Sequence, residues 1–141
     1  MSTENIHATA VSVNKKAVLL LGPSGSGKSD LALRLIMNKN AVLIADDRVD
    51  IISANGVLKA SCPENIKGLL EVRGIGICNF PFLPEENIAL AVQLVSGIKE
   101  TERLPEAETI TFFKIKIPLI KLYPFEVSAA DKVILACDQQ R

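Results

Sequence analysis

The chain has 141 residues, close to the roughly 150 expected of one domain. It carries 16 Lys and Arg against 16 Asp and Glu, so the formal net charge is zero, which argues against nucleic acid or an anionic membrane as a partner. Hydrophobic residues make up 48% and aromatic residues 4%, enough for a folded core but too few rings for a base-stacking platform. No apolar run approaches the roughly 20 residues of a membrane span, and the N-terminus does not resemble a signal peptide. The three cysteines (Cys62, Cys78 and Cys137) lack metal-ligand spacing, so we expect a reduced, soluble, cytoplasmic protein with cysteines in its core.

The first third of the chain predicts a strand, a glycine-rich loop, a helix and a second strand. Residues 16–21 form a short apolar run that stops at Gly22, as in a buried strand. Residues 29–37 then place apolar side chains on one helical face. A second apolar run at 41–45 ends in two aspartates. This order predicts the opening of a βαβ-like unit.

The remaining two thirds predict mainly strands. A hairpin is expected at 49–59 around Asn55-Gly56, then a short helix from 63 to 70 and a glycine-rich loop at 71–77 that leads into a strand. Residues 88–95 fit a helix or a strand by pattern alone, and we favour a strand. A strand at 109–120 and a closing helix at 129–139 complete the prediction. The fold class is therefore α/β, a mixed sheet with few helices and a phosphate-binding loop.

The strongest motif is that loop, which matches the pattern G-x-x-x-x-G-K-[ST] at every fixed position. Its residues are Gly22, Pro23, Ser24, Gly25, Ser26, Gly27, Lys28 and Ser29. Glycines let successive backbone N–H groups point at phosphate oxygens, and the following helix adds its positive dipole end. Lys28 is expected to reach the β- and γ-phosphates and Ser29 to bind Mg²⁺. A chance match in a Gly/Ser-rich turn is the alternative, but the strand before the loop and the helix after it favour nucleotide binding.

Acidic residues follow the next strand and recur further along the chain. Asp46 and Asp47 stand where ligands gather in open α/β sheets, so one could help to hold Mg²⁺ and the other could accept a proton from an attacking hydroxyl. Glu71 and Arg73 lie in a glycine-rich segment that could reach a metal and a phosphoryl group. The alternatives are a solvated acidic turn and a surface loop with a salt bridge. His7, the one histidine, has no role by its pattern alone.

Together these residues resemble the bacterial HPr kinase/phosphorylase family. That family combines the phosphate loop with an Ala-Asp-Asp sequence, found here at 45–47, and a Glu-[Ile/Val]-Arg-Gly-[Leu/Ile]-Gly-Ile signature, found here at 71–77. It also has a histidine upstream of the loop, as His7 stands upstream of Gly22. The chain looks like a short form known from some alphaproteobacteria. We expect one catalytic domain over 1–141, without the separate N-terminal domain of longer members.

The resemblance implies an ATP- and Mg²⁺-dependent kinase that phosphorylates a serine of HPr, the phosphocarrier of the sugar phosphotransferase system. The reverse reaction would use inorganic phosphate and yield pyrophosphate, which is also a possible donor. Lys28 would cradle the β-phosphate, while Ser29 and Glu71 would bind Mg²⁺. Asp47 would be the catalytic base, tuned by His7, and Arg103 matches a family arginine in its sequence context. The family also implies a homo-oligomer, a hexamer in its longer members.

Two other functions stay open at this stage. A small-molecule kinase would need a lid and several arginines, whereas this chain has five arginines in all and little room for a lid. A nucleotide-binding regulator without kinase activity would need the phosphate loop but neither His7 nor Asp47.

Overall fold

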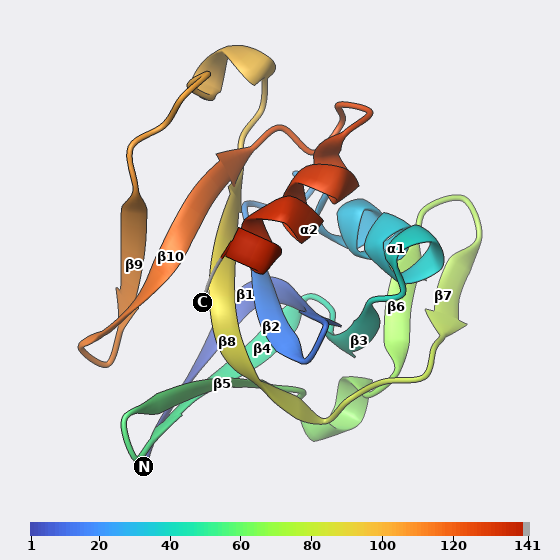
Figure 1. Cartoon of the computed structure of the whole chain (residues 1–141). Coiled ribbons are helices and arrows are strands. Elements are labelled where there is room, and N and C mark those ends of the chain that lie inside the picture. Colours follow the sequence, from blue (N-terminus) through green and yellow to red (C-terminus); the bar gives the residue numbers. More distant parts are fainter. Residues whose placement is uncertain (140–141) are drawn as a thin grey trace.

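The computed structural model describes residues 1–139. In this range the elements follow one another as β1 (Ser2–Val13), β2 (Lys16–Leu21), α1 (Lys28–Lys39), β3 (Val42–Ala45), β4 (Arg48–Ala54), β5 (Val57–Ser61), the 3₁₀ turn η1 (Glu64–Ile66), β6 (Leu69–Val72), β7 (Gly76–Asn79), β8 (Glu85–Leu94), the 3₁₀ turn η2 (Ile98–Glu100), β9 (Glu108–Phe112), β10 (Ile115–Leu122) and α2 (Ala129–Gln139). Figure 1 shows both α-helices on one side of the sheet and the β6–β7 hairpin beside α1. The predicted α/β class with a mixed sheet and few helices is confirmed.

The strand that precedes the phosphate loop lies in the middle of the sheet. β2 pairs antiparallel with β1 on one side and parallel with β8 on the other. β10 continues the sheet parallel to β8, and β3 pairs antiparallel with the far side of β1. Strands β2, β3, β8 and β10 therefore all run in the same direction. Their carboxyl ends share one edge of the sheet, which is where α/β proteins gather ligand groups.

Two long strands join this sheet to a second layer. Residues 2–7 of β1 pair with β4, whereas its residues 8–13 pair with β2. β8 likewise starts against β5 at 85–87 and then continues between β2 and β10. The β4–β5 hairpin is thereby connected to the main sheet at both ends (Figure 1).

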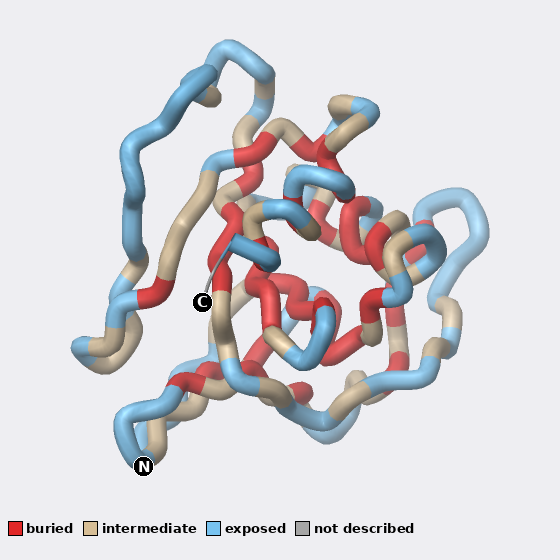
Figure 2. The backbone as a smooth tube through the Cα atoms, viewed as in Figure 1, coloured by how far each residue is buried: buried red, intermediate tan, exposed pale blue. Residues whose placement is uncertain are grey.

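Alternate side chains of β2 point into two separate hydrophobic cores, one on each face of the sheet. Val18 and Leu20 point into the core beneath α1 and α2, whereas Ala17 and Leu19 point into the core beneath β4 and β5. Successive strand residues face opposite sides of a sheet, so a run buried on both faces must be apolar throughout. Figure 2 shows the buried segments gathered in the middle of the molecule. The phosphate loop therefore starts directly from a strand, β2, that is buried on both faces.

Most of the predicted elements are confirmed, including β2, α1, β3, β8 and α2. The hairpin turn at Asn55-Gly56 is confirmed as well, with both residues at positive φ. The prediction missed β1, the strand that contains His7. Because β1 lies between β2 and β3, the predicted βαβ-like opening has an antiparallel strand inserted between its two parallel ones.

Three predicted segments are wrong in detail. The helix expected at 63–70 is a single 3₁₀ turn, because Gly68 takes a φ of +73° and β6 starts directly after it. The loop expected at 71–77 is a hairpin in which β6 contains Glu71. The strand expected at 109–120 is also a hairpin. It reverses at Phe113 and Lys114, both at positive φ without the Gly or Asn that usually marks such a turn.

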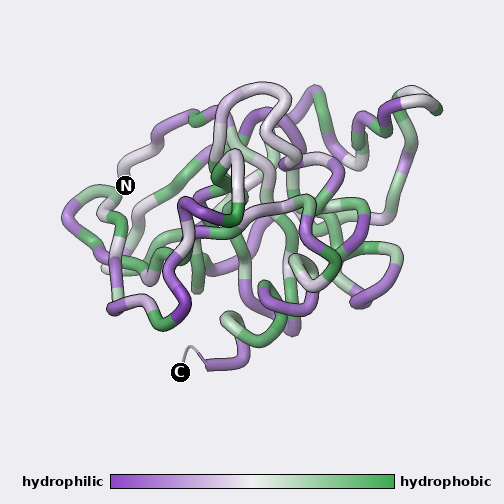
Figure 3. The backbone as a smooth tube through the Cα atoms, turned by 90° about the horizontal axis from the view of Figure 1, so that it is seen from above, coloured by the Kyte–Doolittle hydropathy of each residue, from purple (hydrophilic) through white to green (hydrophobic). Residues whose placement is uncertain are grey.

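Two of the three cysteines lie in the core, as expected from the sequence. Cys62 and Cys137 are buried, and burial raises the pKa of both thiols, whereas Cys78 is half-buried. Among the described residues, no helix is long and apolar enough to cross a bilayer. Figure 3 agrees, since hydrophobic stretches of the tube are short and alternate with hydrophilic ones.

Candidate active site

The candidate site lies at the carboxyl edge of the parallel strands. The phosphate loop follows β2, the aspartate pair follows β3, and the 123–128 connection follows β10. β6 reaches the same place from beside α1 (Figure 1). These segments enclose an open cavity of about 430 Å³. Its lining residues are His7, Thr9, Ser24, Gly25, Gly27, Lys28, Ser29, Asp30, Leu33, Asp46, Asp47, Glu71, Val72, Arg73 and Phe125.

The phosphate loop has the geometry needed to hold an anion. Gly27 takes a φ of +103°, which a residue with a side chain rarely adopts, and its carbonyl accepts the first helical hydrogen bond of α1, from Leu31 N–H at 2.9 Å. Gly27 is the N-cap of α1 and has no side chain that could cap the first N–H groups of the helix. The first N–H groups of the helix therefore remain for a ligand, and the helix dipole favours a negative one.

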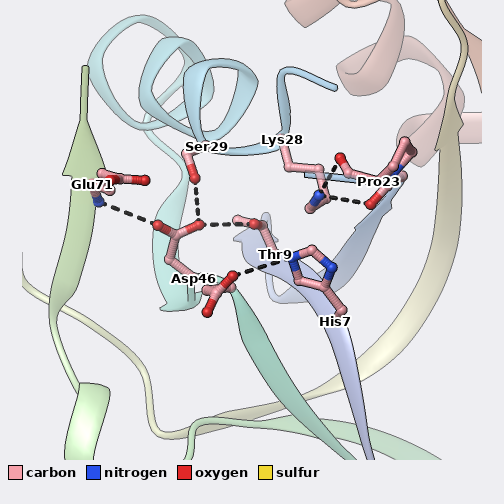
Figure 4. A network of polar contacts seen from close by, with 9 residues as sticks. His7, Thr9, Pro23, Lys28, Ser29, Asp46 and Glu71 are labelled. Carbon is pink, nitrogen blue, oxygen red and sulfur yellow. Dashed lines mark hydrogen bonds and ion pairs between the residues drawn. The ribbon is translucent and has the colours of Figure 1, made fainter. Parts of the chain in front are cut away.

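Lys28 is buried in this loop and held by its carbonyls. Its ammonium donates to the Gly22 carbonyl at 2.7 Å and to the Pro23 carbonyl at 2.9 Å (Figure 4). Burial lowers the pKa of Lys28 below its ordinary value, and the negative charges of Asp46 and Asp47 oppose that decrease. An ammonium has three N–H donors, so the third can serve a phosphate oxygen.

Asp46 is buried and accepts hydrogen bonds from three different segments of the chain. Its Oδ1 accepts from Thr9 Oγ1 at 2.8 Å and from Ser29 Oγ at 2.7 Å, while its Oδ2 accepts from Glu71 N–H at 3.2 Å (Figure 4). These contacts fix the carboxylate against β1, α1 and β6. This carboxylate therefore lies directly beside the hydroxyl that the motif assigns to a metal.

Asp47 has a different environment from its neighbour. It takes a φ of +72°, and its side chain is 74% exposed at the cavity. Nε2 of His7 lies 3.1 Å from its Oδ1. An exposed carboxylate paired with an imidazole can accept a proton from a hydroxyl that enters the cavity.

The cavity has a charge imbalance that fits a divalent cation. The described residues lining it include four acidic side chains (Asp30, Asp46, Asp47 and Glu71) and two basic ones (Lys28 and Arg73). A polyphosphate would meet net repulsion here unless a cation entered with it. No group of three or more His, Cys, Asp or Glu among the described residues forms a complete metal cage. Mg²⁺ does not need one, because it keeps several waters and uses one or two carboxylates plus substrate phosphates.

The structure brings together His7, Asp46, Asp47, Glu71 and the phosphate loop, as the sequence predicted. Arg103 lies in the exposed connection between η2 and β9 and is not among the described residues that line the cavity.

Sequence reasoning missed several further lining residues, among them Thr9 and Phe125. Thr9 could have been found, because it stands two positions after His7 and alternate residues of a strand share a face. Phe125 had no signal, since it follows an unremarkable strand at no fixed distance from any motif.

Comparison with known proteins agrees with this geometry. The family model described as the HPr Serine kinase C-terminal domain matches residues 1–136. The chain is 37% identical to the HPr kinase/phosphorylase of Brevibacillus brevis over 129 residues, which cover 84% of this chain and 41% of that protein. It is 35% identical to the HPr kinase/phosphorylase of Bordetella pertussis over 130 residues, which cover 85% of this chain and 42% of that protein.

A solved structure shares the fold over nearly the whole chain. The Hpr(Ser) kinase/phosphatase from Coxiella burnetii superposes with a TM-score of 0.83 at 26% sequence identity, covering 96% of both chains. The curated relatives are longer, and the chain spans about two-fifths of their length. The family match over residues 1–136 confirms the resemblance read from the motifs, and the chain belongs to the HPr serine kinase C-terminal domain family.

Proposed function

We propose that the chain is the catalytic domain of an ATP- and Mg²⁺-dependent kinase that phosphorylates a serine of an HPr-type phosphocarrier protein. The observation that carries this proposal is the pair His7–Asp47, which stands at the same cavity as the phosphate loop. A phosphate loop alone would suit many nucleotide-binding proteins. An exposed carboxylate, oriented by an imidazole and facing that loop, adds a base for a hydroxyl acceptor.

The donor would be held by the loop and by the metal ligands. Backbone N–H groups of the loop and the Lys28 ammonium would bind the β- and γ-phosphates. Ser29, Asp46 and Glu71 would hold Mg²⁺, directly or through water. When bound, Mg²⁺ neutralises phosphate charge. Asp46 holds the Ser29 hydroxyl in place, and Arg73 supplies a second positive charge at the cavity wall.

Transfer would proceed by attack of the serine oxygen on the γ-phosphorus. The new O–P bond forms as the bond to the bridging oxygen breaks, and ADP leaves. Asp47 takes the serine proton, and His7 keeps its carboxylate oriented. In the reverse direction inorganic phosphate would attack phosphoserine, Asp47 would return the proton to the serine oxygen, and pyrophosphate would form. We include this phosphorolysis in the proposal because the same residues serve both directions.

A label-transfer assay tests the proposal. The chain is incubated with γ-labelled ATP, Mg²⁺ and HPr, with a Ser→Ala HPr as the control acceptor. Acid-stable label on HPr that is lost with the control supports the kinase. ATP binding without label on HPr contradicts it and favours a nucleotide-binding regulator, whereas label on a small molecule favours a small-molecule kinase.

The assembly state is part of the same proposal. Family resemblance leads us to propose a homo-oligomer, and light scattering after size exclusion measures its mass directly. A monomer at micromolar concentration would contradict this part and leave the catalytic proposal intact.

A further inference from the structure

The ring of Phe125 forms one wall of the cavity, beside the phosphate loop. Phe125 lies in the 123–128 connection between β10 and α2 and is 57% exposed although it is apolar. A Cβ built on Gly27 would lie only 3.0 Å from its Cζ and 3.1 Å from Cγ of Pro124. The ring and the proline therefore pack closely on the backbone that would hold phosphate, and a side chain at Gly27 would push against them.

Contacts with α1 and α2 fix the backbone of the connection on either side of Phe125, and a neighbouring ring contacts its side chain. Arg34 of α1 donates to the Pro124 carbonyl and pairs with Asp30 through Nε at 3.1 Å. The Tyr123 ring meets the Phe125 ring edge-on, with centroids 5.8 Å apart and an interplanar angle of 76°. The Glu126 carbonyl accepts the Ala129 N–H at 3.1 Å, which joins the connection to the start of α2. Phe125 is thus positioned by its surroundings but left uncovered on its cavity side.

The ring has a chemistry that the rest of the cavity lacks. Acidic and basic groups come from β1, β3, β6 and α1, and they suit phosphates and a cation. Phe125 comes from the connection after β10 and is the only benzene ring among the described residues that line the cavity. It offers nothing to an inorganic phosphate donor such as pyrophosphate. A planar heterocycle attached to the phosphates would gain by stacking on it.

We propose that Phe125 is the contact for the nucleoside part of the donor, so that this chain uses a nucleoside triphosphate in preference to an inorganic polyphosphate. The inference rests on the proposed function, since it assumes that the phosphate loop holds the donor's phosphates. It adds to that function the residue that recognises the rest of the molecule. Stacking on one aromatic ring contributes roughly tenfold to affinity, within a wide range.

The test compares two ligands that share their phosphates. Affinities for ATP and for inorganic tripolyphosphate are measured by calorimetry with Mg²⁺ on the whole chain. The variants are Phe125→Ala, Phe125→Leu and Phe125→Tyr, with Val127→Ala as the matched control. Val127 is a fully exposed apolar residue of the same connection and does not line the cavity. Circular dichroism and the melting temperature of each variant report whether it is folded.

The expected result is a selective loss. Phe125→Ala and Phe125→Leu weaken ATP binding about tenfold and leave tripolyphosphate binding unchanged, while Phe125→Tyr and Val127→Ala bind both ligands as the wild type does. Equal weakening for both ligands overturns the inference, because Phe125 would then only support the loop. Unchanged ATP affinity in Phe125→Ala, or a wild type that binds tripolyphosphate as tightly as ATP, also overturns it. A wild type that binds neither ligand overturns the phosphate site itself, which separates that failure from a failure of the ring assignment.

Discussion

His7 and Asp47 are joined through both their side chains and the adjoining backbone. Nε2 of His7 lies 3.1 Å from Oδ1 of Asp47, and the N–H of the next residue, Ala8, donates to the Asp47 carbonyl at 3.2 Å. β1 therefore orients a carboxylate that is 74% exposed. A base that is oriented without being buried suits an acceptor too large to enter a closed cavity, such as a serine on a protein surface.

Replacement of the proposed base should abolish most phosphoryl transfer but leave ATP affinity nearly unchanged. Asp47→Asn is expected to lower phosphoryl transfer by roughly 10²- to 10⁴-fold, because an amide cannot accept the serine proton. ATP affinity should change less than about twofold, since the loop and Lys28 remain intact. Single-turnover transfer and calorimetry measure the two quantities. Full activity in Asp47→Asn would show that the base lies elsewhere.

Removal of the loop lysine should affect binding and turnover together. Lys28→Ala loses the ammonium that lies against the loop carbonyls at 2.7 and 2.9 Å, so both ATP affinity and transfer should fall by about tenfold or more. Lys59→Ala is the control, because Lys59 forms an exposed pair with Glu85 away from the cavity. Unchanged ATP affinity in Lys28→Ala would mean that this loop does not bind the nucleotide.

The lowered pKa of Lys28 gives a pH dependence with a definite sign. Burial disfavours the charged form, so the lysine loses its proton at a pH below the ordinary value of 10.5. Affinity for ATP without Mg²⁺ should therefore be full at neutral pH and decline as pH rises toward that value. Lys28→Arg keeps its charge over this range, and any binding that it retains should not show the decline. A wild-type profile that stays flat through pH 10.5 would contradict the assignment.

The hydroxyl of Thr9 should matter through Asp46. Thr9→Val keeps the shape of a fully buried side chain but removes the 2.8 Å hydrogen bond to Oδ1. The free energy of unfolding should fall by about 1–3 kcal/mol, because a buried carboxylate loses a donor. The Mg²⁺ concentration for half-maximal transfer should rise, since Asp46 also accepts from Ser29. Thr9→Ser should restore the Mg²⁺ response, and failure to do so would limit Thr9 to packing.

The three thiols should differ in their reactivity toward iodoacetamide. Cys62 and Cys137 are buried and their raised pKa keeps them protonated at neutral pH, whereas Cys78 is half-buried on β7. Thiolates are the reactive species, so the folded protein should be alkylated first at Cys78 and at the other two only in denaturant. Mass spectrometry of peptides locates the label, and early labelling of Cys137 would contradict the packing of α2.

The elements that sequence reasoning predicted well are those with strong local patterns. β2 is apolar on both faces and stops at Gly22, so its burial between two cores follows from composition. α1 and the Asn55-Gly56 turn also follow from nearby residues. The β9–β10 turn did not, because Phe113 and Lys114 adopt positive φ only where strand pairing imposes it.

The residues of the candidate site likewise fall into those that local sequence pattern predicts and those that depend on distant strand pairing. The phosphate loop and Asp46-Asp47 lie next to the strands that position them, so local pattern placed them correctly. Thr9 and Phe125 enter through pairing partners distant in sequence, β1 against β3 and β10 against β8. The sequence near Phe125 carries no sign of its pairing, so pattern could not place it, whereas Thr9 could be placed only once β1 was recognised as a strand that shares a face with His7.

The position of β8 has a consequence for synthesis on the ribosome. β2 has β8 as its parallel neighbour, with Leu19 opposite Ala91 and Leu20 opposite Val92. One side of the strand that precedes the phosphate loop thus stays unpaired until residues 85–94 leave the exit tunnel, and long-range parallel pairing forms slowly. Nascent chains that end at residue 84 should remain open to protease. The nucleotide site should then assemble late, after more than half of the chain has been made.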